Sequence, residues 1–148
     1  MKKIWLIIVI TTVILASFIL KTKPASTTRK LTIKNKVTIS VDVADTNQKR
    51  AQGYSNHPEI DYNQGLLFIF DKADKYPFWM KEMLFDLDFI FINENQVVYL
   101  LRNIKAPRNN NGRIEYAISQ EPFDRVLEVK AGFIDRYKIS LQDSVALE

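Results

Sequence analysis

Two aspartates, Asp86 and Asp88, stand in one of the most apolar stretches of the chain, YPFWMKEMLFDLDFIFI at residues 76–92. An aromatic pair and a lysine precede them in the same stretch. A carboxylate in apolar surroundings is costly unless a cation or several N–H donors compensate its charge. We therefore expect Asp88 to be compensated, with Lys81 and Arg125 as the candidate cations, and Asp86 to be a solvated surface acid.

The same residue types would suit a binding cleft for a sugar or a peptide. Aromatic rings offer flat apolar surfaces, and a few charged side chains fix the orientation of a ligand. The candidate binding residues are Phe78, Trp79, Lys81, Asp88, Arg125 and Glu128. A structural role is the alternative for each: Trp79 would lie in the core, Asp88 in an ion pair, and Glu128 on the exposed face of a strand.

An enzymatic alternative uses Asp88 and Glu128 as the acid and base of a hydrolase that acts on envelope carbohydrate. That chemistry needs carboxyl groups roughly 5 to 9.5 Å apart. The chain has no cysteine and a single histidine, His57, so thiol nucleophiles, disulfides and multi-histidine metal sites are excluded. We expect His57 to be a surface turn residue, with no metal and no cofactor. With no recognisable catalytic motif, binding is favoured over catalysis.

A third alternative is a docking module for a membrane or envelope protein. Four cations gather around the polar stretch 105–113 and would suit an acidic partner. They are Arg102, Lys105, Arg108 and Arg113. A solvated polar loop explains them equally well.

The N-terminal segment predicts a membrane anchor. Residues 4–20 are uncharged and lie between Lys3 and Lys21. Seventeen helical residues span about 25 Å, a little less than the roughly 30 Å hydrocarbon layer, and flanking lysines can reach the interface. We predict a single-pass signal anchor over residues 1–23; a cleaved signal peptide is the alternative.

The distribution of charge argues against nucleic-acid binding. The chain has a net charge of +4, but Lys21–Lys36 holds six of the positive residues and no acid. From Val37 onward, 13 Lys and Arg face 17 Asp and Glu, which leaves −4. The basic segment Lys21–Lys36 would instead contact anionic lipid. A positive-inside count would keep the domain in the cytoplasm, whereas a short basic head before an apolar run is typical of export; we expect an extracytoplasmic domain.

The remaining pattern predicts a polar linker over residues 24–30 and a β-rich domain over 31–148. Strands are expected over 37–43, 66–70, 78–81, 87–92, 97–102 and 125–130, with a final edge near 144–147. A short helix is expected from Asp45 or Thr46 to Gln52, a helical turn near 133–137, a hairpin at 93–96 and a mobile loop over 105–113. These elements predict a mainly β fold, either an antiparallel sandwich or a partly closed barrel with one or two short helices.

Several motifs occur together in an order that resembles a known family. They are Arg50-Ala51-Gln52-Gly53, Gly65-Leu66-Leu67-Phe68, Phe78-Trp79-Met80-Lys81, Leu87-Asp88 with Phe91-Ile92, Ala106-Pro107, and Val126-Leu127-Glu128 with Ala131-Gly132. The chain resembles domain of unknown function 192 over roughly Val37 to Val145. The resemblance implies a compact, mainly β domain, commonly found behind a signal sequence, with no established reaction. This chain departs from the family pattern at Glu82-Met83, where Asn-Thr is common, and at Asp86, where proline is common.

Overall fold

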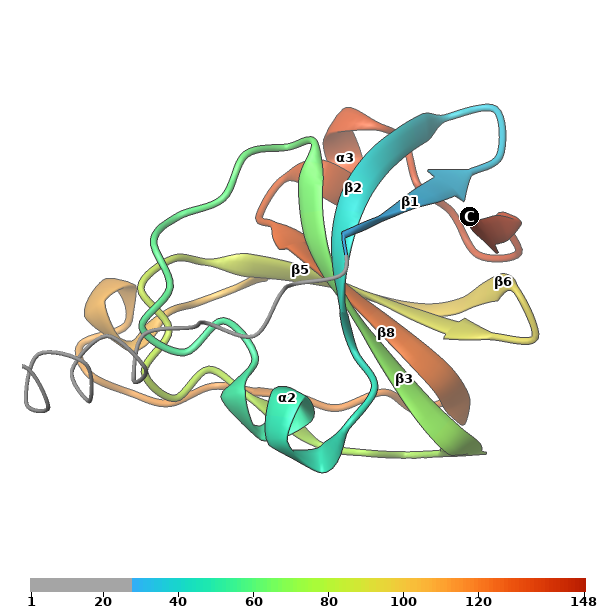
Figure 1. Cartoon of the computed structure of the whole chain (residues 1–148). Coiled ribbons are helices and arrows are strands. Elements are labelled where there is room, and N and C mark those ends of the chain that lie inside the picture. Colours follow the sequence, from blue (N-terminus) through green and yellow to red (C-terminus); the bar gives the residue numbers. More distant parts are fainter. Residues whose placement is uncertain (1–27) are drawn as a thin grey trace, which may run out of the picture.

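The computed structural model describes residues 28–148, which form a mainly β protein with two short α-helices (Figure 1). Seven strands form one sheet in the order β6-β5-β8-β3-β2-β1-β9. Their bounds are β1 Arg29–Ile33, β2 Val37–Ala44, β3 Gln64–Asp74, β5 Leu87–Asn93, β6 Gln96–Ile104, β8 Phe123–Lys130 and β9 Val145–Leu147. The other two strands, β4 (Phe78–Trp79) and β7 (Tyr116–Ala117), pair in a separate small sheet. The helices are α2 (Asn47–Gln52), α3 (Phe133–Arg136) and the 3₁₀-helix η1 (Pro107–Asn109).

The predicted membrane anchor at residues 4–20 lies outside the described residues. Within residues 28–148, no helix combines the length and the apolar character that crossing a membrane requires. Strand β1 begins at Arg29, inside the segment predicted to be linker. The last two residues of that segment therefore belong to the sheet.

The seven-stranded sheet is antiparallel except between β2 and β3, which run parallel with Val41 opposite Gly65. The prediction of an all-antiparallel sheet is wrong for this pair. Parallel neighbours need a crossover connection instead of a hairpin. The segment between Ala44 and Gln64, which contains α2, makes this crossover.

The sheet curls into a half-barrel, so that its two edge strands approach each other at one end (Figure 1). Gln96, the first residue of β6, forms an isolated antiparallel bridge with Ser144, next to β9. The Val97 N–H donates to Asp143 O at 3.0 Å, and the Val145 N–H donates to Asn95 O at 2.8 Å. Of the two predicted architectures, the partly closed barrel describes the sheet better.

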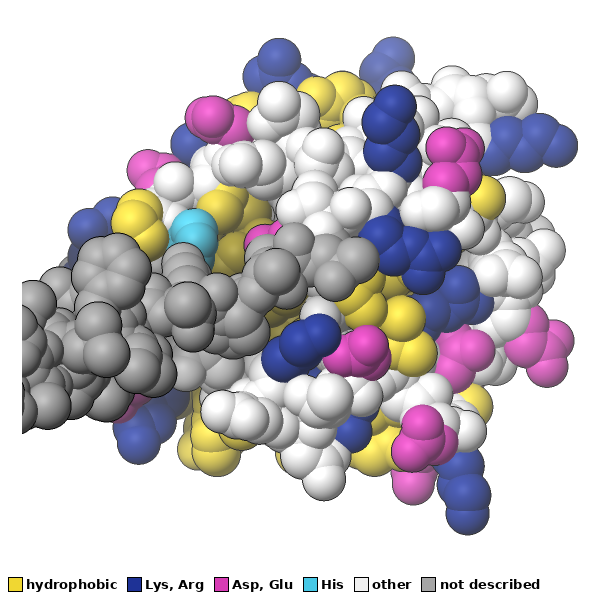
Figure 2. All heavy atoms as spheres, viewed as in Figure 1, with side chains coloured by type: hydrophobic (Ala, Val, Ile, Leu, Met, Phe, Trp, Pro, Cys, Tyr) yellow, Lys and Arg dark blue, Asp and Glu magenta, His cyan; other side chains and the backbone are white. Residues whose placement is uncertain are grey.

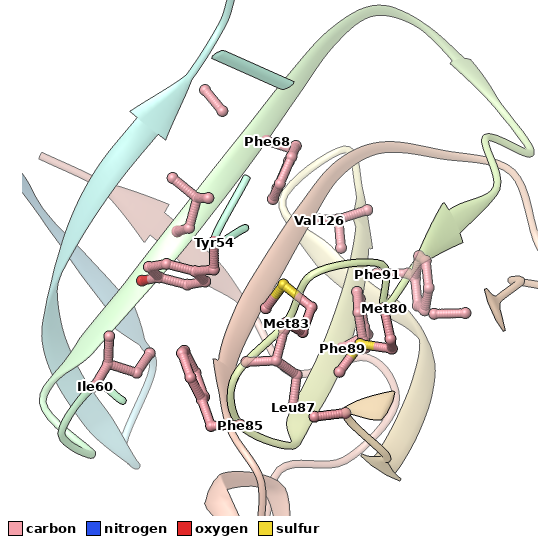
Figure 3. Packing of buried hydrophobic residues seen from close by; sticks show 14 of the residues in the cluster. Tyr54, Ile60, Phe68, Met80, Met83, Phe85, Leu87, Phe89, Phe91 and Val126 are labelled. Carbon is pink, nitrogen blue, oxygen red and sulfur yellow. The ribbon is translucent and has the colours of Figure 1, made fainter. Parts of the chain in front are cut away.

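Both faces of the sheet are covered by apolar clusters. The inner cluster has residues from all seven strands, packed with Phe133 and Ile134 of α3. The outer cluster lies on the opposite face, where side chains from the connecting segments cover β3, β5 and β8 (Figure 3). Successive residues of a strand point to opposite faces, so Leu67 and Ile90 enter the inner cluster while Phe68 and Phe89 enter the outer one.

The helix α2 begins and ends where the sequence predicts. Thr46, one of the two predicted N-caps, accepts a hydrogen bond from the Lys49 N–H at 3.2 Å. Gln48 is not the capping partner, because Lys49 occupies the third helical position after this cap. Gly53 ends the helix with φ +48°, a left-handed conformation that glycine adopts at no steric cost.

The predicted hairpin joins β5 and β6. Its turn residues Glu94 and Asn95 have φ +49° and +68°, as two-residue hairpin turns with left-handed central residues require. Gly65 on β3 is needed for a different reason, because a Cβ there would lie 3.0 Å from Leu127 Cδ1 and 3.1 Å from Glu128 O. This glycine allows β3 and β8 to approach closely beside Glu128.

Candidate functional site

A pocket of about 440 Å³ opens on the outer face of the sheet. Helix α2 and the turn after it form one wall, β3 forms the second, and β4 with β7 forms the third. Its lining residues are Asn47, Arg50, Ala51, Gln52, Gly53, Tyr54, Ser55, Phe68, Phe70, Tyr76, Pro77, Phe78, Trp79, Met83, Tyr116 and Glu128. Six of these side chains are aromatic besides Tyr54, so the pocket is mainly apolar and aromatic. In the view of Figure 2, apolar side chains gather beside His57, while basic and acidic side chains are interspersed across the face.

Glu128 is the buried charged residue of this pocket. It lies in the middle of β8, opposite Leu66 of β3 and Phe89 of β5, and is only 5% exposed. Its Oε2 atom has no hydrogen-bond partner among the described residues. Burial raises the pKa of the Glu128 carboxyl from 4.5 to about 8, because the charged form loses its hydration. The expectation that Glu128 is an exposed strand residue is wrong, since the outer cluster covers the face from which it projects.

Tyr54 covers the same region from the turn after α2. It is 6% exposed and packs against Phe85, with ring centroids 5.7 Å apart (Figure 3). Burial, and then the neighbouring charges of Glu128 and Asp42, raise the pKa of the Tyr54 hydroxyl well above its usual range. The phenol therefore stays protonated.

The aromatic walls are held in place by contacts among the rings. Phe68 meets Phe78 edge to face at 5.1 Å, and Phe70 stacks on Tyr76 at 4.1 Å. Aromatic pairs in these arrangements add to the stability that burial alone provides. The walls are thus formed before any ligand binds.

Trp79 and Tyr116 form the rim of the pocket. They are register partners across β4 and β7, and each is 58% exposed. Ile118, two residues along from Tyr116, is 56% exposed. Trp79 does not belong to the core, which removes the structural alternative considered for it.

Arg50 fixes α2 against β3 at the other end of the pocket. Its Nη1 donates to Ile69 O at 2.7 Å and to Asp45 O at 3.0 Å, and its Nη2 donates to Asn47 Oδ1 at 2.6 Å. The guanidinium also lies 5.2 Å from the centre of the Phe70 ring. Ile69 and Glu128 are three register positions apart, since Leu66 faces Glu128 and Ile69 faces Arg125. At about 3.3 Å per strand residue, the cation and the carboxyl are separated by roughly 10 Å along the sheet.

Asp88 is buried away from the pocket. It is 1% exposed and accepts hydrogen bonds from the Asn103 N–H at 2.8 Å and the Ile134 N–H at 2.9 Å. Ile134 lies in the first turn of α3, where backbone N–H groups lack partners within the helix. Asp88 is thus compensated by amide donors, and the predicted cation partners Lys81 and Arg125 are wrong. Lys81 is exposed, and Arg125 Nε bonds Asp124 at 3.2 Å.

Asp88 and Glu128 lie on opposite faces of the sheet. Asp88 faces Val129 and Phe89 faces Glu128 in the continuous pairing of β5 with β8. Register partners point to the same side and neighbours along a strand to opposite sides. The two carboxyls cannot act on one glycosidic bond, so the geometry gives no support to the hydrolase alternative.

Asp86 is not a solvated surface acid as expected. It is partly buried and bonds Lys105 Nζ, the Ala106 N–H and Asn109 Nδ2, each at 2.9 Å. Burial by itself would raise the pKa of this carboxyl, but the bonds from Asn109, Ala106 and Lys105 outweigh it and lower the pKa. Two of the four cations proposed for docking are tied in ion pairs, Lys105 to Asp86 and Arg102 to Asp135.

The pocket brings together three of the six residues predicted from the sequence, namely Phe78, Trp79 and Glu128. Lys81, Asp88 and Arg125 do not line it. The sequence analysis did not select Tyr54, Phe68, Arg50 or Tyr116. Arg50 and Phe68 occur in the shared motifs, which was the available signal, whereas Tyr116 lies on a strand that the pattern did not predict. Among residues 28–148, no group of three or more His, Cys, Asp or Glu side chains could hold a metal ion.

The fold and the pocket define a class: a small, mainly β domain with a half-barrel sheet and an aromatic pocket on its outer face. The family model described as "Uncharacterized ACR", domain of unknown function 192, matches residues 29–147. The chain belongs to this family, which confirms the resemblance seen in its motifs.

Solved structures of similar fold come from two bacteria. A Sinorhizobium meliloti 1021 protein, described as a candidate transcription regulator, has 23% identity and a TM-score of 0.73, covering 85% of this chain and 98% of that one. A Novosphingobium aromaticivorans DSM 12444 protein of unknown function has 21% identity and a TM-score of 0.69, covering 85% and 94%. At these identities the likeness shows the fold alone. No curated protein matches the chain.

Proposed function

We propose that the protein is a ligand-binding module at the cell membrane, whose site is the aromatic pocket between α2, β3 and the β4–β7 sheet. The observation that carries this proposal is the buried Glu128 carboxyl, with an oxygen that lacks a partner, in a pocket lined by aromatic rings. A buried polar group without a partner is destabilising and needs an explanation beyond folding. A ligand that supplies the missing hydrogen bond provides one.

The shape of the pocket supports a ligand with a flat apolar part, such as a peptide side chain or the apolar face of a sugar. Pockets of this volume, mostly apolar with a few placed polar groups, are typical of small-molecule sites. The exposed rings of Trp79 and Tyr116 at the rim would meet such a ligand first. No pair of catalytic carboxyls shares the pocket, so binding is the function that this geometry supports best.

Fluorescence of Trp79 tests the pocket directly. The full chain has two tryptophans, so a Trp5→Phe variant in lipid nanodiscs reports from Trp79 alone. We expect saturable quenching by 2-phenylethanol, a neutral aromatic probe. Ala51→Leu, which fills the pocket from exposed helix α2, should weaken binding at least roughly tenfold, the equivalent of about 1.4 kcal/mol.

A matched control is available on the same helix. Gln48 is also exposed on α2 but does not line the pocket. Gln48→Leu should therefore leave binding of 2-phenylethanol unchanged. Absence of saturable quenching, or equal losses in the two variants, would overturn the proposal.

The membrane part of the proposal rests on residues 4–20 and on the basic segment that follows. Lys30 and Lys34 are exposed and suit contact with anionic lipid, whereas Arg29 Nε bonds Glu148 O and Lys36 pairs with Asp143. A reporter enzyme that is active only outside the cytoplasm, fused after Glu148, tests the orientation. We expect activity; a silent reporter with normal expression would place the domain in the cytoplasm.

A further inference from the structure

Glu128 narrows the chemistry of the ligand. This inference rests on the proposed function, because it concerns the same pocket. We propose that the ligand binds through a protonated amine, whose N–H groups bond the Glu128 carboxylate while its hydrocarbon part lies against Phe68, Phe78 and Trp79. A lysine side chain, a peptide N-terminus or a free aliphatic amine has this chemistry.

The first argument is the lack of a cation near Glu128. Six ion pairs connect side chains among residues 28–148, and none of them includes Glu128. Arg50, the cation that lines the pocket, is bonded at the far end to Ile69, Asp45 and Asn47. A buried carboxylate is stable when a cation pairs with it. The protein does not supply that cation, whereas an amine ligand would.

The second argument is the chemistry of the walls. Aromatic faces carry partial negative charge and attract cations within about 6 Å, most strongly for tryptophan. The pocket has Phe68, Phe78 and Trp79 on two of its walls. An ammonium group held between these rings and a carboxylate is attracted by both. An anionic ligand group at the Glu128 end would be repelled by both.

The third argument concerns protons. With its pKa raised to about 8, Glu128 is mostly protonated at pH 7. Pairing with an ammonium ligand requires the carboxyl to release its proton to the solvent, so amine binding should strengthen as pH rises from 6 to 8. The other titratable group that faces Glu128 is the Tyr54 hydroxyl, which stays protonated throughout this range. A neutral ligand would leave the proton on Glu128 and show no such rise.

Two probes of the same shape distinguish an amine from a neutral ligand. We would titrate 2-phenylethylamine and 2-phenylethanol into the full chain in zwitterionic nanodiscs by calorimetry, with empty nanodiscs to subtract partitioning. At pH 8 the amine should bind at least roughly tenfold more tightly than the alcohol. At pH 7, buffers of different ionisation enthalpy should show release of about one proton with the amine and none with the alcohol.

Glu128→Gln, which mimics the neutral carboxyl, should remove the preference for the amine and the proton release while keeping binding of the alcohol. Gln48→Leu should change neither. Binding of the alcohol with equal or weaker binding of the amine would overturn this inference and leave the pocket as a binding site. A preference for the amine that survives in Glu128→Gln would overturn it too. Failure of both probes to bind would overturn the proposed function together with the inference.

Discussion

Asp88 and Glu128 stand on neighbouring strands, one register step apart, yet project from opposite faces of the sheet. The inner carboxyl, Asp88, is compensated by two backbone amides from β6 and α3. The outer carboxyl, Glu128, has an oxygen without a partner and lies in the pocket. Two acids of similar burial therefore have different roles: Asp88 holds the fold together, and Glu128 is free to meet a ligand.

Asp88→Asn should destabilise the domain strongly. The amide can accept one of the two backbone hydrogen bonds, but its NH₂ group would then face the N–H of Asn103 or Ile134. Leaving a buried donor unpaired costs about 1–3 kcal/mol, and more where a charged acceptor was lost. Urea unfolding should show a loss of about 2–4 kcal/mol. Asp71→Asn, at an exposed acid on β3, is the control and should change stability little; equal losses in both variants would contradict the role of Asp88.

The stability of the domain should fall as pH rises from about 4.5 to about 8, through the contribution of Glu128. The folded pKa of about 8 exceeds the ordinary value of 4.5, so the folded state holds a proton that the unfolded state releases in this window. Each unit of difference is worth about 1.4 kcal/mol, and the decline continues until the folded carboxyl ionises. Urea unfolding across this pH range measures it.

Glu128→Gln should remove that decline and make the variant more stable than the original chain at pH 8. Near pH 4.5 the two should have similar stability, because both side chains are then neutral. Glu121→Gln, at an exposed acid, is the matched control and should keep the decline. A decline that persists in Glu128→Gln would show that another group causes it.

Glu82→Asn should stabilise the domain. Glu82 has φ +59°, a left-handed conformation that costs most residues about 1–2 kcal/mol and that asparagine tolerates better. The family resemblance places asparagine at this position, and the backbone conformation explains why. We expect a gain of about 0.5–1 kcal/mol in the free energy of unfolding. Glu82→Ala separates the backbone effect from loss of the side chain, and an Asn variant no more stable than the Ala variant would refute the explanation.

Asp86→Ala should loosen the segment 105–112. The sequence suggested a mobile loop here, but Asp86 holds it through Lys105, Ala106 and Asn109. Hydrogen exchange of the Ala106 amide should become faster by at least tenfold, equivalent to about 1.4 kcal/mol of local stability. Because the pKa of Asp86 is lowered by these bonds, its contribution is present above pH 3.8 and is lost as pH falls through the lowered value. Unchanged exchange in the variant would show that the loop is held by other contacts.

Local patterns predicted much of the fold. The strict alternation of residues 37–43 gave β2, the Asn-rich tetrapeptide at 93–96 gave the β5–β6 hairpin, and the Thr46 cap with Gly53 gave α2. Strand β1 was partly missed because Arg29 and Lys30 extend the polar composition of the preceding segment. The parallel β2–β3 pair could not be predicted, since pairing direction depends on the path of the crossover.

The site was harder to predict because burial depends on which segments cover each face. Glu128 follows the alternation of an exposed position, yet residues 54–60 and 80–85 cover it. The amide partners of Asp88 come from Asn103 and Ile134, 15 and 46 residues away. Composition indicated that a carboxyl in this apolar context needs compensation, but only the folded chain shows which groups provide it.

The most direct test of the central claim is a carboxyl ¹³C NMR titration of Glu128 in glutamate-labelled protein, with Glu128→Gln to assign the signal. In the free protein the carboxyl should titrate with a pKa of about 8. Saturating 2-phenylethylamine should lower that pKa, because the bound ammonium stabilises the carboxylate. A free carboxyl that titrates near 4.5, or one whose pKa the bound amine leaves unchanged, would contradict the account.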